Sequence, residues 1–120
     1  DGFAIYDTIM SLDSPVSTIC TGLAASMGSI LLSAGKKGRR FIQPHAKVMI
    51  HQPSGGARGQ ASNIEIAAAE ILKTKHLSAE ILAENCGQTV EKVLKDFNRD
   101  YWMDANESLE YGIVDGIFKK

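Results

Sequence analysis

The spacing of apolar positions changes along the first third of the chain. Residues 3–12 carry apolar side chains three and four apart, which predicts a helix that Pro15 ends. Residues 16–20 are rich in β-branched side chains and predict a short strand. Residues 24–34 are small or apolar on nearly every side, which predicts a buried helix closed by Gly35.

The longest amphipathic pattern follows in the second half. Residues 47–50 predict another buried strand, and the prolines and glycines of residues 52–59 predict an irregular arm. Ser62 and Glu65 form a capping-box pair that starts a helix about 35 Å long, ending at Gly87. So long a helix in a small domain indicates a contact with another subunit, although packing along its own core is the alternative.

Two short helices and a strand complete the pattern. Thr89 begins one helix, and Asp104, paired with Glu107, begins the other, which Gly112 closes. Residues 113–118 predict the last strand. The order is helix, strand, helix, strand, arm, three helices and strand, which is typical of an α/β protein with crossover connections.

Composition narrows the class of protein. A chain of 120 residues holds at most one domain. Its net charge of −1 argues against an extended electrostatic potential that would attract nucleic acid or a membrane surface. The basic run at residues 36–40 is either a nucleic-acid patch or a solvated turn, and the turn is favoured because no second basic cluster supports the patch. No apolar run approaches the roughly 20 residues of a membrane span. The first residue is not Met, which indicates a piece of a longer or processed chain.

The two cysteines indicate structure rather than chemistry. Cys20 lies in an apolar run and Cys86 precedes a predicted helix end, with no CxxC or metal-like spacing. We expect Cys20 to be a core thiol and both cysteines to have structural roles, in a reducing compartment and with no metal bound.

Ser26 is the first candidate for chemistry. It lies in Gly22–Gly28, where an apolar strand gives way to a small-residue helix, and this context resembles a nucleophile elbow with Ala24 in place of the first glycine. Free N–H groups at a helix N-terminus can stabilise an oxyanion. Serine is also a common helix cap, so the motif alone leaves both roles open.

His51 is the matching candidate base. It follows the apolar residues 48–50 directly, at a strand end where scaffolds often place functional groups. From there it can take the proton of a serine hydroxyl. The alternative is a structural histidine whose ring nitrogens form hydrogen bonds to the main chain at a sheet edge. His45 and His76 are better explained as surface residues, since one lies in a turn and the other on the long charged helix.

A triad needs an acid, and the pattern alone does not select one. Asp100 is attractive because it is expected at a helix end beside two aromatic residues that can shield it. The other downstream candidates are Glu65, Glu70, Glu80, Glu84, Glu91, Asp96, Asp104, Glu107, Glu110 and Asp115.

Along essentially its whole length the chain resembles the proteolytic subunits of the Clp protease family. The carrying segments are Ala4–Thr8, Gly22–Gly28, Val48–Pro53, Gly59–Ala61, Ile64–Ile66, Arg99–Asp100 and Glu110–Gly112. The resemblance implies Ser26 as nucleophile, His51 as general base and Asp100 as acid. The backbone N–H of Met27 would be one oxyanion donor.

The resemblance also implies binding and contact residues. Ser54, Gly55 and Gly56 would line the substrate through main-chain pairing. Gln60 and Arg99 would be oligomer contacts, and Asn98 replaces the acid that often precedes the arginine in this family.

The fold implied by the resemblance is α/β and crotonase-like, a repeated ββα superhelix with a protruding handle helix. The N-terminal part of the family fold would be absent, including the loop that gives the second oxyanion donor. Residues 1–120 would then form a single Clp-protease-type catalytic domain, a fragment of a longer subunit.

The implied function is hydrolysis of unfolded proteins and peptides inside a chamber of two stacked seven-membered rings. An AAA+ Clp ATPase would feed this chamber, and the subunit itself would need no cofactor. The expected location is the bacterial cytoplasm, with mitochondrial matrix or plastid stroma as options. The alternatives are a non-catalytic Clp-like ring subunit and a crotonase-type acyl-CoA enzyme.

Overall fold

The computed structural model describes residues 2–53 and 61–119, the side chains of residues 61–63 excepted. Helices and strands alternate along most of this length. In chain order they are α1 (Gly2–Ser11), β1 (Thr18–Cys20), β2 (Leu23–Ala25), α2 (Met27–Ser33), β3 (Arg40–Ile42), β4 (Lys47–Ile50), α3 (Ala61–Cys86), α4 (Val90–Asp96), β5 (Tyr101–Met103), α5 (Ala105–Tyr111) and β6 (Gly116–Ile117).

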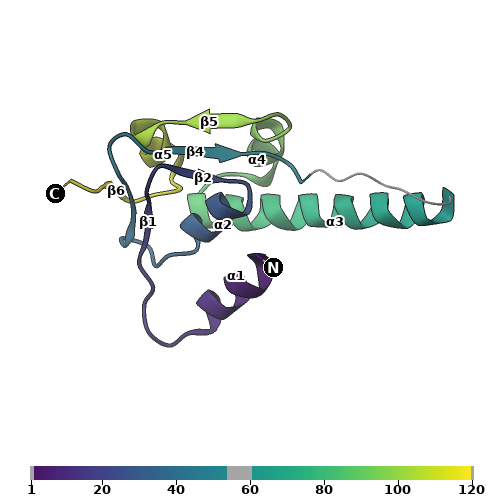
Figure 1. Cartoon of the computed structure of the whole chain (residues 1–120), viewed down its shortest axis with the longest axis horizontal. Helices are drawn as coiled ribbons and strands as arrows, with labels where there is room; N and C mark the ends of the chain where they lie inside the picture. The colour runs from purple at the N-terminus through teal and green to yellow at the C-terminus, as the bar shows by residue number, and fades with distance from the viewer. Residues whose placement is uncertain (1, 54–60, 120) are drawn as a thin grey trace.

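The strands form two small sheets that the chain visits in turn. β1, β3 and β6 run parallel in one sheet, while β2 and β4 run parallel in the other, where β5 joins β4 antiparallel. The chain passes from β1 to β2 and into α2, and later from β3 to β4 and on to α3 (Figure 1). Two turns of the predicted ββα repeat are therefore present. Gly22, at φ +74°, lies in the turn between β1 and β2 in a conformation that favours glycine.

The hydrophobic core gathers side chains from both sheets and from helices α2 to α5. Val48, Phe97 and Ile113 are fully buried within it. Cys20 and Cys86 are also buried and unpaired, which confirms the predicted place of Cys20 in the core. Burial raises the pKa of the Cys86 thiol to about 12, so this thiol stays protonated at neutral pH and is a poor nucleophile.

Helix α3 extends well beyond this core. Its 26 residues span about 39 Å at 1.5 Å per residue. Ala79, Leu82 and Cys86 near its C-terminus are buried, whereas Ile66 and Leu72 in its first half are 64% and 54% exposed. Figure 1 shows the N-terminal part of α3 projecting away from the sheets, as predicted for a handle helix.

Three strands were not predicted, β2, β3 and β5, and of these β2 and β5 border the candidate site. The helix expected over residues 24–34 begins only at Met27, because β2 pairs with β4, with Ala24 opposite Val48. Alanine favours helix locally, and this tertiary pairing overrides that preference. Asp100 was expected at a helix end, but α4 ends at Asp96 and Asp100 immediately precedes β5.

Arg40 corrects the interpretation of the basic run as a solvated turn. Its side chain is 2% exposed and forms a two-point ion pair with Asp115, with Nε–Oδ2 at 2.8 Å and Nη2–Oδ1 at 2.7 Å. Its Nη1 also donates to the carbonyl of Asn85 at 2.7 Å. No local pattern indicates that the last residue of the run turns inward, because its partner lies 75 positions away.

The predicted caps of the two short helices are confirmed. The Thr89 side chain accepts from the N–H of Lys92, and Asp104 and Glu107 form a complete capping box. Gly112 ends α5 in the left-handed conformation, where a Cβ would lie 2.2 Å from the carbonyl oxygen of Cys86. The capping box predicted from Ser62 lies outside the described side chains.

Asp115 makes the stability of this fold depend on pH. The hydrogen-bonded Arg40 guanidinium lowers the pKa of Asp115 from 3.8 to about 2. Because the folded pKa lies below the unfolded one, the stabilisation is complete above about pH 5 and is lost as the pH falls through about 2. We expect the contribution of this residue to the free energy of unfolding to fall by about 2 kcal/mol over this pH range, as measured by urea unfolding. Asp115→Asn should remove this part of the pH dependence and the exposed control Asp7→Asn should keep it; equal slopes in both variants would contradict the assignment.

Candidate active site

Ser26 occupies a sharp turn between β2 and α2. Its φ of 54° and ψ of −121° make it the one non-glycine residue of the described chain with a positive φ. Such a conformation costs about 1–3 kcal/mol and persists only where the surroundings hold it. Here the Ser26 N–H donates to the Met49 carbonyl at 3.1 Å, and Ser29 N–H donates to the Ser26 carbonyl at 3.0 Å. The exposed hydroxyl thus lies on a strand–turn–helix elbow of the kind that presents nucleophiles.

His51 lies beside Ser26 because their strands are parallel neighbours. β2 and β4 end at the same sheet edge, with Ala25 opposite Met49. Residues that follow these strands therefore meet, as at the carboxyl ends of other parallel sheets. The Ser26 hydroxyl and His51 Nε2 form a short hydrogen bond. The structure brings these two predicted residues together.

The partner of the other ring nitrogen is not Asp100. His51 Nδ1 lies 2.6 Å from the main-chain carbonyl oxygen of Gln52. A carbonyl can only accept, so Nδ1 carries the proton of the neutral ring and Nε2 is free to accept from Ser26. The structure therefore holds the tautomer that a serine–histidine pair needs.

Asp100 is not joined to this pair. The antiparallel register of β4 and β5 ends with Ile50 opposite Tyr101. The next residues along the two strands are His51 and Asp100. The Asp100 side chain is exposed, and no hydrogen bond of the described residues joins it to His51. The assignment of Asp100 as the acid stays a prediction that the strand register favours.

Met27 is the first residue of α2 and directly follows the candidate nucleophile. The first N–H groups of a helix have no carbonyl partner within the helix and carry partial positive charge. An N–H directly after the nucleophile is the kind of group that would donate to the oxyanion formed on the substrate carbonyl when Ser26 attacks. Its role as a donor remains a prediction.

A cavity of about 250 Å³ opens beside Ser26 and His51. Apolar side chains of Phe3, Met27 and Ile30 line much of it. Pro53, Thr74 and Ser78 complete the lining. The cavity is a suitable size for one apolar side chain of a bound peptide.

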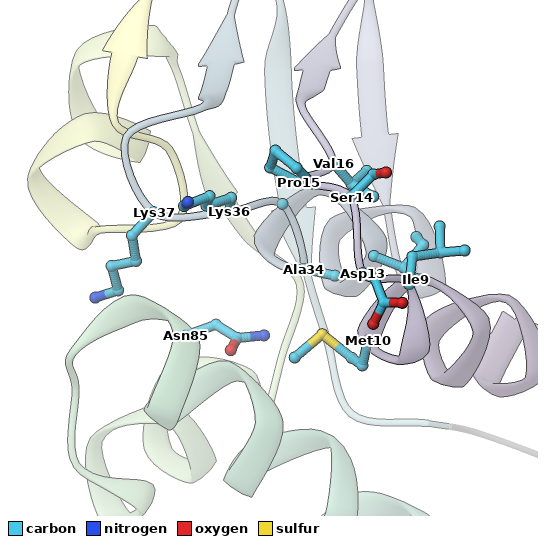
Figure 2. A pocket seen from close by; sticks show the side chains of 12 residues that line it. Ile9, Met10, Asp13, Ser14, Pro15, Val16, Ala34, Lys36, Lys37 and Asn85 are labelled. Atoms are coloured by element: carbon cyan, nitrogen blue, oxygen red, sulfur yellow. The ribbon is translucent and has the colours of Figure 1, made fainter.

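A larger cavity, about 390 Å³, lies elsewhere, between the end of α1 and the turn after α2. Figure 2 shows Met10 and Asn85 pointing toward one another across it, while Lys37 points away. It contains none of the predicted catalytic residues. Within the described residues, no group of three His, Cys, Asp or Glu side chains is arranged to hold a metal ion. Among the described helices, none combines the length and apolar character required to cross a membrane.

The remaining predicted residues are only partly described. Arg99 is exposed, as are His45 and His76, which agrees with the surface positions predicted for the two histidines. The predicted substrate and contact residues Ser54, Gly55, Gly56 and Gln60 lie outside the described residues.

Gln52 is the site residue that sequence reasoning missed. Its carbonyl contacts His51, its N–H donates to the Phe97 carbonyl at 2.7 Å, and its side-chain Nε2 donates to the Asn98 carbonyl at 3.1 Å. Its position between His51 and Pro53 was the available signal, but a main-chain acceptor leaves no trace in residue type.

Comparison with known proteins gives one consistent result. The model of the Clp protease family matches residues 1–120. The ATP-dependent Clp protease proteolytic subunit of Porphyromonas gingivalis (strain ATCC BAA-308 / W83) is 56% identical over 119 residues. The match covers 99% of this chain and 54% of that protein, so the chain spans about half the length of this curated relative.

Proposed function

Because this chain belongs to the Clp protease family, we propose that it carries the catalytic pair of a serine endopeptidase subunit. The observation that supports this most directly is the hydrogen bond between the Ser26 hydroxyl and His51 Nε2 at the strand–helix elbow. A nucleophile and a base in hydrogen-bond contact, with the base held in one tautomer, are the minimum for acyl transfer.

The proposed reaction proceeds through an acyl-enzyme. His51 Nε2 takes the Ser26 proton as Oγ attacks the peptide carbonyl carbon, and the Met27 N–H stabilises the resulting oxyanion. His51 then gives this proton to the leaving amine, the C–N bond breaks, and the acyl group stays on Ser26. In the second half, water attacks the acyl carbon while His51 accepts its proton. The ester bond to Ser26 then breaks, His51 returns the proton to Ser26 Oγ, and the carboxylic acid product is released. The Asp100 carboxylate would stabilise the imidazolium formed in each half.

The proposed substrates are unfolded polypeptides. Ser54, Gly55 and Gly56 would pair with the main chain of the substrate. Such pairing does not depend on the substrate side chains, so it accepts many sequences. The apolar cavity beside Ser26 would accept a medium-sized apolar side chain next to the scissile bond. Cleavage of many sequences with an apolar bias is the expected specificity.

The proposed assembly is a double ring fed by an AAA+ ATPase. Support comes from the relative, whose name specifies an ATP-dependent Clp protease, and from the exposed apolar residues of α3, including Ile66 and Leu72. Gln60 and Arg99 would join the contacts between rings. A second oxyanion donor would come from the part of a full-length subunit that this chain does not span. The proposed location is the bacterial cytoplasm, in keeping with the bacterial relative.

Active-site labelling tests this function against the two alternatives. A full-length subunit carrying this sequence should be labelled covalently by a fluorophosphonate, with the probe on Ser26, because only an activated serine reacts readily. We expect His51→Ala to reduce labelling at least about 100-fold, as followed by mass spectrometry of the modified peptide. A non-catalytic ring subunit would remain unlabelled, and a crotonase-type enzyme would instead show saturable binding of coenzyme A.

A further inference from the structure

Gln52 is held on two sides by the turn that leads to Asp100. Its N–H donates to the carbonyl of Phe97 at 2.7 Å, and its side-chain amide donates to the carbonyl of Asn98 at 3.1 Å. Phe97 is fully buried, so the first of these bonds anchors Gln52 to the core. The hydrogen bond from the Gln52 side-chain amide to the Asn98 carbonyl is exposed, but it fixes the same turn, two residues before Asp100.

The anchored residue presents its carbonyl to His51. The distance from His51 Nδ1 to this oxygen is 2.6 Å, just below the usual range of N–H···O hydrogen bonds. The acceptor is neutral, so it fixes the ring tautomer without adding a negative charge. A carboxylate in its place would do both, since it also stabilises the imidazolium.

We propose that Gln52 is a positioning residue: its main-chain carbonyl and the Asp100 carboxylate are alternative acceptors for the same His51 proton. This inference rests on the proposed peptidase function. The carbonyl holds neutral His51 ready to accept from Ser26, and the carboxylate takes over when the ring becomes charged. The Gln52 side chain ties the carbonyl acceptor to the turn that leads to Asp100.

The test is a double-mutant cycle in the assembled full-length subunit, read as kcat/KM for an unstructured peptide. Asp100→Ala should lower kcat by about 10²-fold, less than the roughly 10⁴-fold that loss of the acid costs other serine proteases, because the carbonyl still fixes the tautomer. Gln52→Met keeps the length of the side chain but removes its amide. In an otherwise unaltered subunit this substitution should lower kcat/KM by less than about 3-fold. In a subunit that already carries Asp100→Ala, the same substitution should lower kcat by at least about a further 10-fold, with KM unchanged.

Gln88→Met is the matched control. The Gln88 amide donates to the Tyr111 carbonyl at 2.8 Å, a bond of the same type away from the predicted catalytic residues. It should leave kcat unchanged in both backgrounds while shifting the melting temperature by an amount similar to Gln52→Met. A purely structural role for Gln52 would instead give equal losses with and without Asp100, and that additivity would overturn the proposal.

Two further outcomes are also decisive. If Asp100→Ala alone lowers hydrolysis to the level of Ser26→Ala, the carbonyl does not hold His51 and the positioning role is wrong while the peptidase function stands. If a subunit whose only change is Ser26→Ala still hydrolyses the peptide, the peptidase function itself is wrong, and the role of Gln52 fails with it.

Discussion

Ser26→Ala in the full-length, assembled subunit is expected to lower peptide hydrolysis by about 10⁶-fold, to a residual rate still about 10³–10⁴-fold above the uncatalysed reaction. The hydroxyl that His51 contacts is the proposed attacking group, and alanine offers no replacement. The backbone conformation of Ser26 is strained for alanine as it is for serine, so the elbow itself should be retained. The measurement is release of a fluorescent group from a short peptide, with assembly verified by size-exclusion chromatography.

Ser17→Ala is the control for this change, because Ser17 is an exposed serine distant in sequence from the elbow. It should leave hydrolysis within about twofold of the original rate. Residual hydrolysis of one tenth or more in the Ser26→Ala subunit would exclude Ser26 as the nucleophile. A subunit that failed to assemble would be recognised by its elution volume, and the fluorophosphonate experiment would then decide the role of Ser26 without any substitution.

Arg40→Met is expected to destabilise the fold by about 3–5 kcal/mol. The substitution leaves the Asp115 carboxylate, which is 21% exposed, without its guanidinium partner. It also removes the donor to the Asn85 carbonyl near the C-terminus of α3. The free energy of unfolding, obtained from urea titrations at neutral pH, is the quantity to compare.

Arg39→Met provides a closely matched control. Arg39 precedes Arg40 in the chain but is exposed, so its replacement should change the free energy of unfolding by no more than about 0.5 kcal/mol. If the two substitutions had the same small effect, the ion pair to Asp115 would contribute little. Adding Asp115→Leu to Arg40→Met should recover part of the loss, because no charge is then left buried without a partner.

Much of the fold followed from local signals. The caps at Thr89 and Asp104 and the closing Gly112 are correct in the structure because each makes its bonds within a few residues. The strand over residues 47–50 was predicted with its bounds, since it is apolar and flanked by turn residues. β2, β3 and β5 were missed because such short strands depend on pairing with other strands, which no local pattern reveals.

The candidate site divides in the same way. Ser26 and His51 were predicted from their places after apolar strands and from their resemblance to one family, and the structure joins them. Asp100 was predicted from the resemblance and directly precedes β5, whose first residue lies opposite Ile50, but it is not bonded to His51. The acceptor that the structure does provide, the Gln52 carbonyl, belongs to the main chain and is common to every residue type.

The sequence by itself determined which residue types are available for acyl transfer and which family the chain resembles. Those properties reside in side-chain chemistry and in short motifs, both of which can be read from residue order. Tertiary structure alone decided that Arg40 turns inward to Asp115 and that Gln52 holds His51. Each depends on how distant segments pack: Asp115 lies 75 positions from Arg40, and Gln52 is fixed by the turn after α4. Only the folded chain brings these groups within hydrogen-bond distance.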